Sequence, residues 1–369
     1  MGSNSKRVSK TAESRSKQDG QSSLILPAAA SLEPAKLKQL YSTMLGCRML
    51  NERLRVLVSQ GVIGRDLPVE AGVEALESGS LINLAEDDCV ASGRRQYMAH
   101  FIHGMPLRTI FAGLSRHESA EHRKAEFAES KNVGPILPWS SSAAQLNQLT
   151  GAAWAFRLQK RPQAAILVSA DPSAWGDTLH EAVSVSAAYK LPVVYIVSGG
   201  HVDDPGSANP NGQSQERQKF ASHLGLPSFL VDVTDAVAVY RVAQEAIRRA
   251  RQGHGPAFIE CKTCVPATSS SNIEARSSED PLSRMEAHLR SKKLWSDTWK
   301  VKLVQTFMRQ LDRATTVARQ ETQPLRTASI TASSSITSAP AGSQAESGER
   351  NSFESHIVRD SSRLAGSRG

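Results

Sequence analysis

The alternation of short apolar segments with longer amphipathic segments between residues 164 and 261 most constrains what this chain can fold into. Short runs of apolar and β-branched residues are typical of buried strands, and longer segments with a three- and four-residue apolar spacing are typical of helices. An alternating order of the two predicts right-handed crossovers and a parallel sheet with helices on both faces. The predicted strands are residues 164–168, 193–198, 228–233 and 257–261, and the predicted helices are residues 178–189, 215–224 and 235–252.

Two short turns follow neighbouring strands of this predicted sheet. Ala170-Asp171-Pro172 follows the first strand, and Gly199-Gly200 follows the next strand along the chain. Parallel strands end at the same edge of a sheet, and open α/β folds bind their ligands at that carboxyl edge. The sequence therefore predicts that Asp171 and Gly200 lie close together in the candidate binding region.

The rest of the folded part is predicted to be mainly helical. Residues 34–60 show a continuous helical apolar spacing, and Pro34 suits the first turn of such a helix. A second helix, residues 73–84, carries small residues around Gly79 that would let another backbone approach closely. Further helices are predicted at residues 98–114 (interrupted at 104–106), 143–159 and within 280–314, a short strand at 89–91, and polar loops at 115–132 and 201–213.

The two ends of the chain differ in composition from the middle. Residues 1–23 are Ser, Lys and Arg with almost nothing apolar, and residues 320–369 are rich in Ser, Thr, Ala and charge. Such segments cannot bury enough apolar surface to offset the entropy lost on ordering. We expect disordered tails at residues 1–31 and 315–369, and one folded domain at residues 32–314.

The chain is basic, with 44 Lys and Arg against 36 Asp and Glu and a net charge of +8. A basic balance is compatible with binding to nucleic acid or another polyanion. No nucleic-acid-binding motif accompanies this charge, which favours a solvated surface and basic tails over a nucleic-acid partner.

The cysteine pattern and the length of the apolar runs bear on the cellular compartment in which we expect this protein. Cys261 and Cys264 form a single CxxC, without the second pair or histidines of a zinc site and without a helix opening behind it as in redox motifs. No apolar run approaches the ~18 residues of a membrane-spanning helix. We expect a cytoplasmic protein, with the mitochondrial matrix as the alternative because the N-terminal stretch is Ser-rich and basic.

Several local motifs occur in a familiar order and spacing. They are Leu40-Tyr41 with Arg48, Gly61-Val62-Ile63-Gly64, Gly72-Val73-Glu74-Ala75, Ala144-Gln145-Leu146, His180-Glu181-Ala182, Lys190-Leu191-Pro192 and Gly255-Pro256-Ala257. Together they resemble the alpha subunit of thiamine-diphosphate-dependent 2-oxo acid dehydrogenases, the first components of the pyruvate, branched-chain and acetoin complexes. The resemblance covers about residues 40–314. It implies a thiamine-diphosphate-binding α/β fold with extra N- and C-terminal helices.

The resemblance also implies a set of cofactor-binding residues. Asp171 stands where the family has the Mg²⁺ ligand of a Gly-Asp-Gly turn, but both glycines are replaced here. Gly200 stands where a second ligand, an Asn, is expected, and it has no side-chain oxygen for Mg²⁺. The Tyr-Arg pair that holds the diphosphate corresponds to Arg94 and Arg95, of which Arg95 keeps the guanidinium.

Other family positions are altered further. The segment that holds the aminopyrimidine ring corresponds to Ala144 and Gln145, preceded by Ala143. Three family histidines near the reacting centre correspond to Pro68, Tyr97 and Ser269. Histidine suits such positions because it exchanges protons near neutral pH, and proline cannot replace it. No catalytic residue of the family is therefore assigned to this chain.

Three functions follow as alternatives. The first is a working alpha subunit that pairs with a beta subunit in a heterotetramer, binds thiamine diphosphate and Mg²⁺, decarboxylates a 2-oxo acid, and passes the acyl group to a lipoyl-bearing acyltransferase. The second is a catalytically degenerate subunit that scaffolds or regulates a beta subunit. The third is a polyanion-binding protein that acts through its basic tails. The altered metal and histidine positions favour the second.

Overall fold

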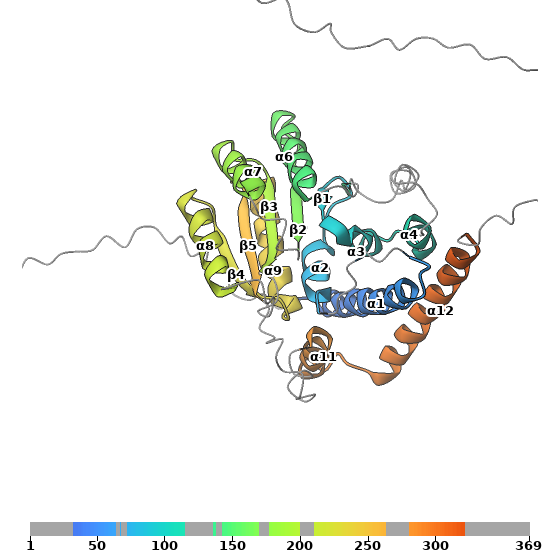
Figure 1. The fold of residues 1–369 in the computed structure, drawn as a ribbon. Helices are drawn as coiled ribbons and strands as arrows, with labels where there is room; N and C mark the ends of the chain where they lie inside the picture. Colours follow the sequence, from blue (N-terminus) through green and yellow to red (C-terminus); the bar gives the residue numbers. More distant parts are fainter. Residues whose placement is uncertain are drawn as a thin grey trace, which may run out of the picture. The chain divides into compact units, whose positions relative to one another are not determined.

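A parallel β-sheet forms the centre of the fold in the computed structural model (Figure 1). The structure describes residues 32–63, 67, 72–114, 136–137, 142–169, 177–199, 210–262 and 280–321. Within these residues, five strands pair in the order β1-β2-β3-β5-β4, and every pairing is parallel. The strands are β1 (Cys89–Ala91), β2 (Ala165–Ser169), β3 (Val193–Gly199), β4 (Ser228–Asp232) and β5 (Ala257–Lys262). The predicted α/β fold with a parallel sheet is confirmed.

The strand order explains which face each crossover helix covers. From β1 through β2 and β3 to β4, the chain moves across the sheet in one direction, whereas from β4 to β5 it moves back. A right-handed crossover that reverses direction must place its helix on the opposite face. Accordingly, α6 (Ser142–Leu158), α7 (Asp177–Ala188) and α8 (Pro210–His223) pack on one face, and α9 (Ala236–Arg251) packs on the other.

Both faces of the sheet are buried. Along β2, Ala165 and Leu167 face the cluster formed with α6, α7 and α8, while Ile166 and Val168 face the cluster formed with α9. The second cluster also includes residues of α2 (Glu74–Leu81) and α3 (Gln96–Ile102). Strands that are covered on both sides need apolar residues at every position, which is why they read as continuous apolar runs in the sequence.

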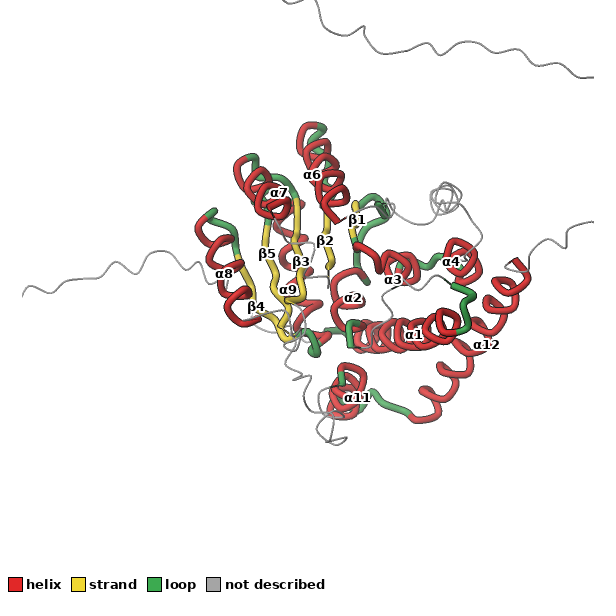
Figure 2. The backbone as a smooth tube through the Cα atoms, viewed as in Figure 1, coloured by secondary structure: helices red, strands yellow, loops and turns green. Residues whose placement is uncertain are grey.

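Among the described residues, four helices lie outside these layers (Figure 2). They are α1 (Pro34–Ser59), α4 (Leu107–Leu114), α11 (Pro281–Ser291) and α12 (Asp297–Glu321). In one cluster α1 packs with α3, α4 and α12, and in another it packs with α2, α9 and α11. The predicted extra N- and C-terminal helices are confirmed.

Helix α2 packs very closely against α9. A Cβ atom added at Gly79 would lie 2.8 Å from the side chain of Val239 and 3.1 Å from the carbonyl oxygen of Ala236. Real Cβ atoms do not approach so closely, so only glycine fits at this crossing. The prediction that small residues of this helix admit a neighbouring backbone is confirmed.

Two boundaries differ from the sequence prediction. Helix α8 begins at Pro210, inside the predicted loop 201–213, because the fixed φ of proline suits the first turn of a helix. Helix α12 continues to Glu321, past residue 314, because Thr315 is buried and accepts a hydrogen bond from Arg53, and Arg319 donates one to Gln60. The predicted tail 1–31, the predicted loop 115–132 and residues 322–369 lie outside the described residues.

The helices that the structure describes include none that is both long enough and apolar enough to cross a membrane.

Candidate functional site

The carboxyl edge of the sheet brings together the strands that lead to the predicted ligand residues. Strands β2 and β3 pair in parallel, with Ser169 opposite Val197, so both end at the same edge. Asp171 follows β2 by two residues, and Gly200 directly follows β3. Both residues lie outside the described residues, so their roles stay predictions, while the adjacency of their strands is established.

The turn after β1 forms the described part of this edge. The 3₁₀ turn η1 (Gly93–Arg95) follows Ser92, and α6 begins at the same edge because it runs back toward the start of β2. The backbone N–H of Gly93 donates a hydrogen bond to the side-chain oxygen of Gln145, with a length of 2.9 Å. Gln145 is buried. The first turn of α6 therefore holds the turn after β1 in place.

Gly93 has a positive φ of 58°. A Cβ atom at this position would meet nothing within 4 Å, so the requirement for glycine is one of backbone conformation and not of space. This left-handed residue turns the chain into η1. As a result, Arg94 and Arg95 follow directly at the carboxyl edge, although the side chain of Arg94 lies outside the description.

Arg95 is 7% exposed and lies near Glu77 of α2, which is 1% exposed. Burial raises the pKa of the Glu77 carboxyl to about 8, and the nearby charge of Arg95 offsets only part of this rise. At neutral pH the Glu77 carboxyl is therefore mostly protonated. An anion-binding role for Arg95 at this edge stays a prediction.

Sequence reasoning missed Glu77. Glu74 and Glu77 occur together in one short predicted helix, but the sequence does not show that every residue of this helix is buried. A buried carboxyl must be paired or protonated, so two such residues in an apolar helix indicate polar partners elsewhere in the fold. Glu74 meets Arg48 of α1, and Glu77 faces Arg95 of the candidate site.

Glu74 belongs to an ion-pair network that connects α1, α2 and the start of α11. The Nε of Arg48 donates to Glu74 at 2.5 Å, and its Nη2 donates to Asp280 at 2.7 Å. The backbone N–H of Gly72 donates to Glu74 at 2.9 Å. Gly72 and Asp280 directly follow residues 68–71 and 263–279, which lie outside the described residues. Arg48 thus links Glu74 of α2 to Asp280 at the start of α11.

Tyr97 does not take up the role of the histidine to which it corresponds. Its side chain is fully buried, and its hydroxyl donates a hydrogen bond to Asn51 of α1 at 2.8 Å. It belongs to the apolar cluster formed with α1 and α4. The sequence does not show this orientation, because it depends on how α3 packs against α1.

Two histidines lie in the C-terminal half of α3 and directly after it, His100 buried and His103 half-buried. Burial lowers the pKa of His100 to about 3, with a further contribution from His103. Burial also lowers the pKa of His103, against a smaller opposing effect of Asp88. Both rings are neutral near pH 7, so neither is poised to exchange protons there.

The described residues at this edge suit an anion better than a metal. Arg95 offers a guanidinium, and Ala144 and Gln145 lie in the first turn of α6. Within the part of the chain that the structure describes, no group of three or more His, Cys, Asp or Glu residues could hold a metal ion. The fold and this edge define an open α/β protein with a candidate anion-binding site at its carboxyl edge.

Comparison with protein-family models places this chain within a known family. Residues 41–265 match the model of the family described as "Dehydrogenase E1 component". The match covers more than half of the 369 residues. The chain therefore belongs to the dehydrogenase E1 component family, as its resemblance to the alpha subunits of 2-oxo acid dehydrogenases predicts.

Curated relatives agree with the family assignment. The pyruvate dehydrogenase E1 component subunit alpha of Staphylococcus aureus is 28% identical over 280 residues, which are 72% of this chain and 73% of the relative. The protein of the same name from Staphylococcus epidermidis is 27% identical over 278 residues, again 72% and 73% of the two chains. These matches show that the sequences are similar, and they do not by themselves assign an activity to this chain.

One solved structure is also similar. A protein from Mycobacterium smegmatis described as a thiamin diphosphate-dependent enzyme has a TM-score of 0.35 and 14% identity, over 52% of this chain and 32% of that chain. A similarity at this level adds no support to the fold, which is defined here by the strand order and the helices on each face.

The family makes thiamine diphosphate with Mg²⁺ the group to test against these residues. Arg95 and the turn held by Gln145 fit a phosphate group. The metal positions do not fit, because Asp171 is followed by Pro172, which lacks an N–H, and Gly200 has no side-chain oxygen. The buried, hydrogen-bonded Tyr97 does not fit a proton-transfer role. The chain fits part of an anion site and not the complete metal-diphosphate site.

Proposed function

We propose that this chain is an alpha-type subunit that assembles with an E1 beta subunit and has no complete catalytic site of its own. It would scaffold or regulate the beta subunit in a heterotetramer. Membership in the dehydrogenase E1 component family supports the assembly, because its curated relatives are named as alpha subunits. The proposed compartment is the cytoplasm, with the mitochondrial matrix as the alternative.

The placement of Tyr97 is the observation that carries this proposal. The position that corresponds to a catalytic histidine holds a fully buried phenol whose hydroxyl is bonded to Asn51. This side chain serves the packing of α3 against α1. Together with Pro68 and Gly200 in the sequence, it removes proton-transfer and metal-binding groups from several separate positions.

A working alpha subunit is the second candidate. Arg95 supports it, because this buried guanidinium lies at the carboxyl edge beside a turn that Gln145 holds in place. Asp171 supports it in the sequence as a remaining Mg²⁺ ligand. In that case the complex would bind thiamine diphosphate and Mg²⁺, decarboxylate a 2-oxo acid and pass the acyl group to a lipoyl-bearing acyltransferase.

Co-purification followed by a turnover assay tests the proposal. The full chain is co-expressed with the E1 beta subunit of the same organism, and decarboxylation of pyruvate and of a branched-chain 2-oxo acid is measured with an artificial electron acceptor. We expect a stable complex without turnover. Absence of a complex would contradict the alpha-type assignment, and turnover of either substrate would contradict the loss of catalysis.

A variant that restores the missing oxygen sharpens this test. Gly200→Asn supplies the side-chain oxygen that Mg²⁺ would need, and Gly200→Ala is the matched control without an oxygen. We expect only the Asn variant to strengthen thiamine diphosphate binding in a Mg²⁺-dependent manner. Equal effects of both substitutions would contradict the idea that this ligand is what the chain lacks.

A further inference from the structure

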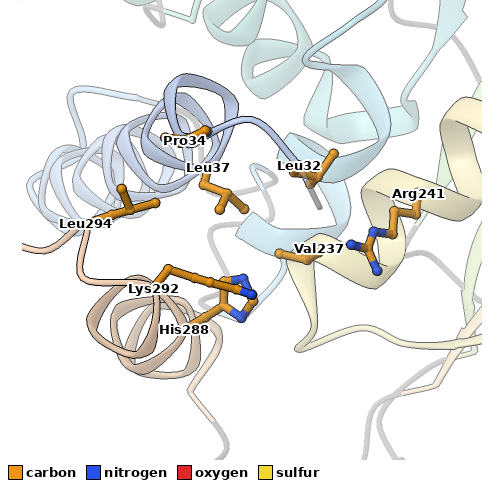
Figure 3. A pocket seen from close by; sticks show the side chains of 8 residues that line it. All are labelled: Leu32, Pro34, Leu37, Val237, Arg241, His288, Lys292 and Leu294. Carbon is orange, nitrogen blue, oxygen red and sulfur yellow. The ribbon is translucent and has the colours of Figure 1, made fainter. Parts of the chain in front are cut away.

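A pocket lies where the N-terminal end of α1, the first turns of α9 and the C-terminal end of α11 meet (Figure 3). Its volume is about 470 Å³. Leu37 of α1 and Val237 of α9 are buried beside it, and Leu32 and Leu294 complete its apolar side. All four residues belong to or pack against one apolar cluster, so the pocket is a gap at the edge of that cluster. Apolar side chains that face such a gap lack van der Waals partners on that side.

The chain enters the described fold beside this pocket. Leu32 precedes α1, which begins at Pro34, and it packs against the same apolar cluster as Leu37 and Val237. Residues 1–31 lie outside the described residues and join the fold at this point. The segment directly before Leu32 is therefore within immediate reach of the gap.

That segment has the composition that an apolar gap requires. Leu24-Ile25-Leu26 is the only run of three large apolar residues before Leu32, and residues 24–31 contain no charged side chain. The run ends six residues before Leu32, and six residues span at most about 20 Å when extended, so it can return to the pocket through a turn. Pro27 favours such a turn because its φ is already fixed.

We propose that residues 24–26 dock into this pocket and anchor the N-terminal segment across α1, α9 and α11. The three side chains cover Leu37 and Val237, which removes apolar area of both surfaces from water. Main-chain carbonyl groups of the docked segment accept hydrogen bonds from the ammonium of Lys292, which lines the pocket and is exposed. The disorder that the sequence predicts at the N-terminus is then confined to residues 1–23.

Site-specific photo-crosslinking in the full chain tests the proposal. The photoreactive amino acid p-benzoylphenylalanine replaces Ile25, and the crosslinked peptides are identified by mass spectrometry. We expect crosslinks to peptides that contain Leu37, Val237 or Leu294. A mixture of ¹⁴N- and ¹⁵N-labelled chains separates crosslinks within one chain from crosslinks between chains. Crosslinks to these peptides only between chains would show that a second copy fills the pocket, and crosslinks only to other parts of the fold would show another docking site. Either result would overturn the proposal.

Matched variants distinguish docking from simple proximity along the chain. Leu24→Ser with Leu26→Ser, introduced into the photoreactive chain, should lower the yield of the pocket crosslinks at least fivefold. Ala28→Ser with Ala30→Ser leaves the apolar run intact and should leave the yield unchanged. Equal yields in the two double variants would overturn the proposal, because the chain connection to Leu32 would then explain the crosslinks.

Thermal unfolding gives an independent measure of docking. The triple variant Leu24→Ser, Ile25→Ser, Leu26→Ser should lower the melting temperature by about 3 °C or more, because the buried side chains no longer stabilise the folded state. The control Ala28→Ser, Ala29→Ser, Ala30→Ser should lower it by less than about 1 °C. Neither variant alters a residue of the described fold, so a melting temperature of the first variant equal to that of the wild type would overturn the proposal.

Discussion

Two buried glutamates on α2, three residues apart, have opposite environments. Glu74 accepts hydrogen bonds from Arg48 and from the backbone N–H of Gly72, so its charge is compensated at short range. Glu77 is just as buried, but its Oε2 has no hydrogen-bond partner among the described residues. Arg95 acts on Glu77 through a Coulombic interaction, and burial raises the pKa of Glu77 to about 8.

These two environments distinguish the structural side of α2, at Glu74, from the side near the candidate site, at Glu77. The Glu74 side of α2 is a completed ion-pair network that connects α1, α2 and the start of α11. The Glu77 side faces the carboxyl edge, where Arg95 follows a left-handed turn at Gly93. On α2, the carboxyl that joins the scaffold elements is hydrogen-bonded at both oxygens, and the carboxyl near the candidate site is not.

Glu74→Gln should give the largest effect on stability. The substitution removes the negative charge that faces Arg48 in a mostly buried pair, and breaking such a pair costs about 3–5 kcal/mol. Urea unfolding at pH 7 measures the change in the free energy of unfolding. Arg53→Met, which breaks the more exposed pair with Asp312 on the same helix α1, is the control and should cost at most about 1 kcal/mol. Equal losses of unfolding free energy in the two variants would contradict the expected difference between the buried and the more exposed ion pair.

Glu77→Gln should change the pH dependence of stability and not simply lower stability. In the unfolded chain this carboxyl ionises near pH 4.5, whereas in the folded chain it keeps its proton up to about pH 8. The folded state therefore binds more protons across this window, and the wild-type protein loses stability as the pH rises through it. The variant lacks this loss, so its stability relative to wild type should rise by roughly 3–5 kcal/mol between pH 4 and pH 9.

Unfolding curves at a series of pH values for wild type and Glu77→Gln check this prediction. The comparison between pH values cancels the constant cost of burying the amide. A difference between the two proteins that stays the same from pH 4 to pH 9 would show that the Glu77 carboxyl ionises in the folded chain as it does in the unfolded chain.

Gly79→Ala and Gly151→Ala form a matched pair of helix substitutions with opposite expected signs. At Gly79 the added Cβ would lie 2.8 Å from Val239, so overpacking should cost about 1–3 kcal/mol. At Gly151 of α6 nothing lies within 4 Å, so alanine should stabilise by about 0.5–1 kcal/mol through helix propensity. Thermal unfolding measures both. A stabilising Gly79→Ala would contradict the close crossing of α2 and α9.

Tyr97→Phe should give a modest loss of stability and no change in ligand binding. The hydroxyl donates one buried hydrogen bond to Asn51, and its loss should cost about 1–2 kcal/mol. Chemical unfolding measures this cost, and titration with thiamine diphosphate should show unchanged affinity. A changed affinity would place Tyr97 at the site instead of in the packing of α3 against α1.

The fold was predictable because its signals are local. The apolar runs of β2, β3 and β5 and the helical spacing of α1 and α9 are read from neighbouring residues, and the structure confirms all of these elements. The boundary error at Glu321 arose because long-range contacts, such as that of Arg319 with Gln60, decide how far the helix extends, whereas Pro210 was a local signal that the prediction did not use.

The site was only partly predictable because its partners are distant in sequence. The hydrogen bond between Gly93 and Gln145 joins residues 52 positions apart, and the pair of Arg48 with Asp280 spans 232 positions. Periodicity carries no information about such contacts. The sequence did indicate Arg95 and Gln145 through the family resemblance, whereas Glu77 became visible only once α2 was packed beside η1.

Calorimetric titration of the purified complex of this chain and its beta subunit with thiamine diphosphate, in the presence and absence of Mg²⁺, tests the central claim most directly. The account predicts weak binding or none, with no gain in affinity when Mg²⁺ is added, because the chain retains a guanidinium at Arg95 but lacks the second metal ligand at Gly200. Micromolar or tighter binding that depends on Mg²⁺ would contradict it.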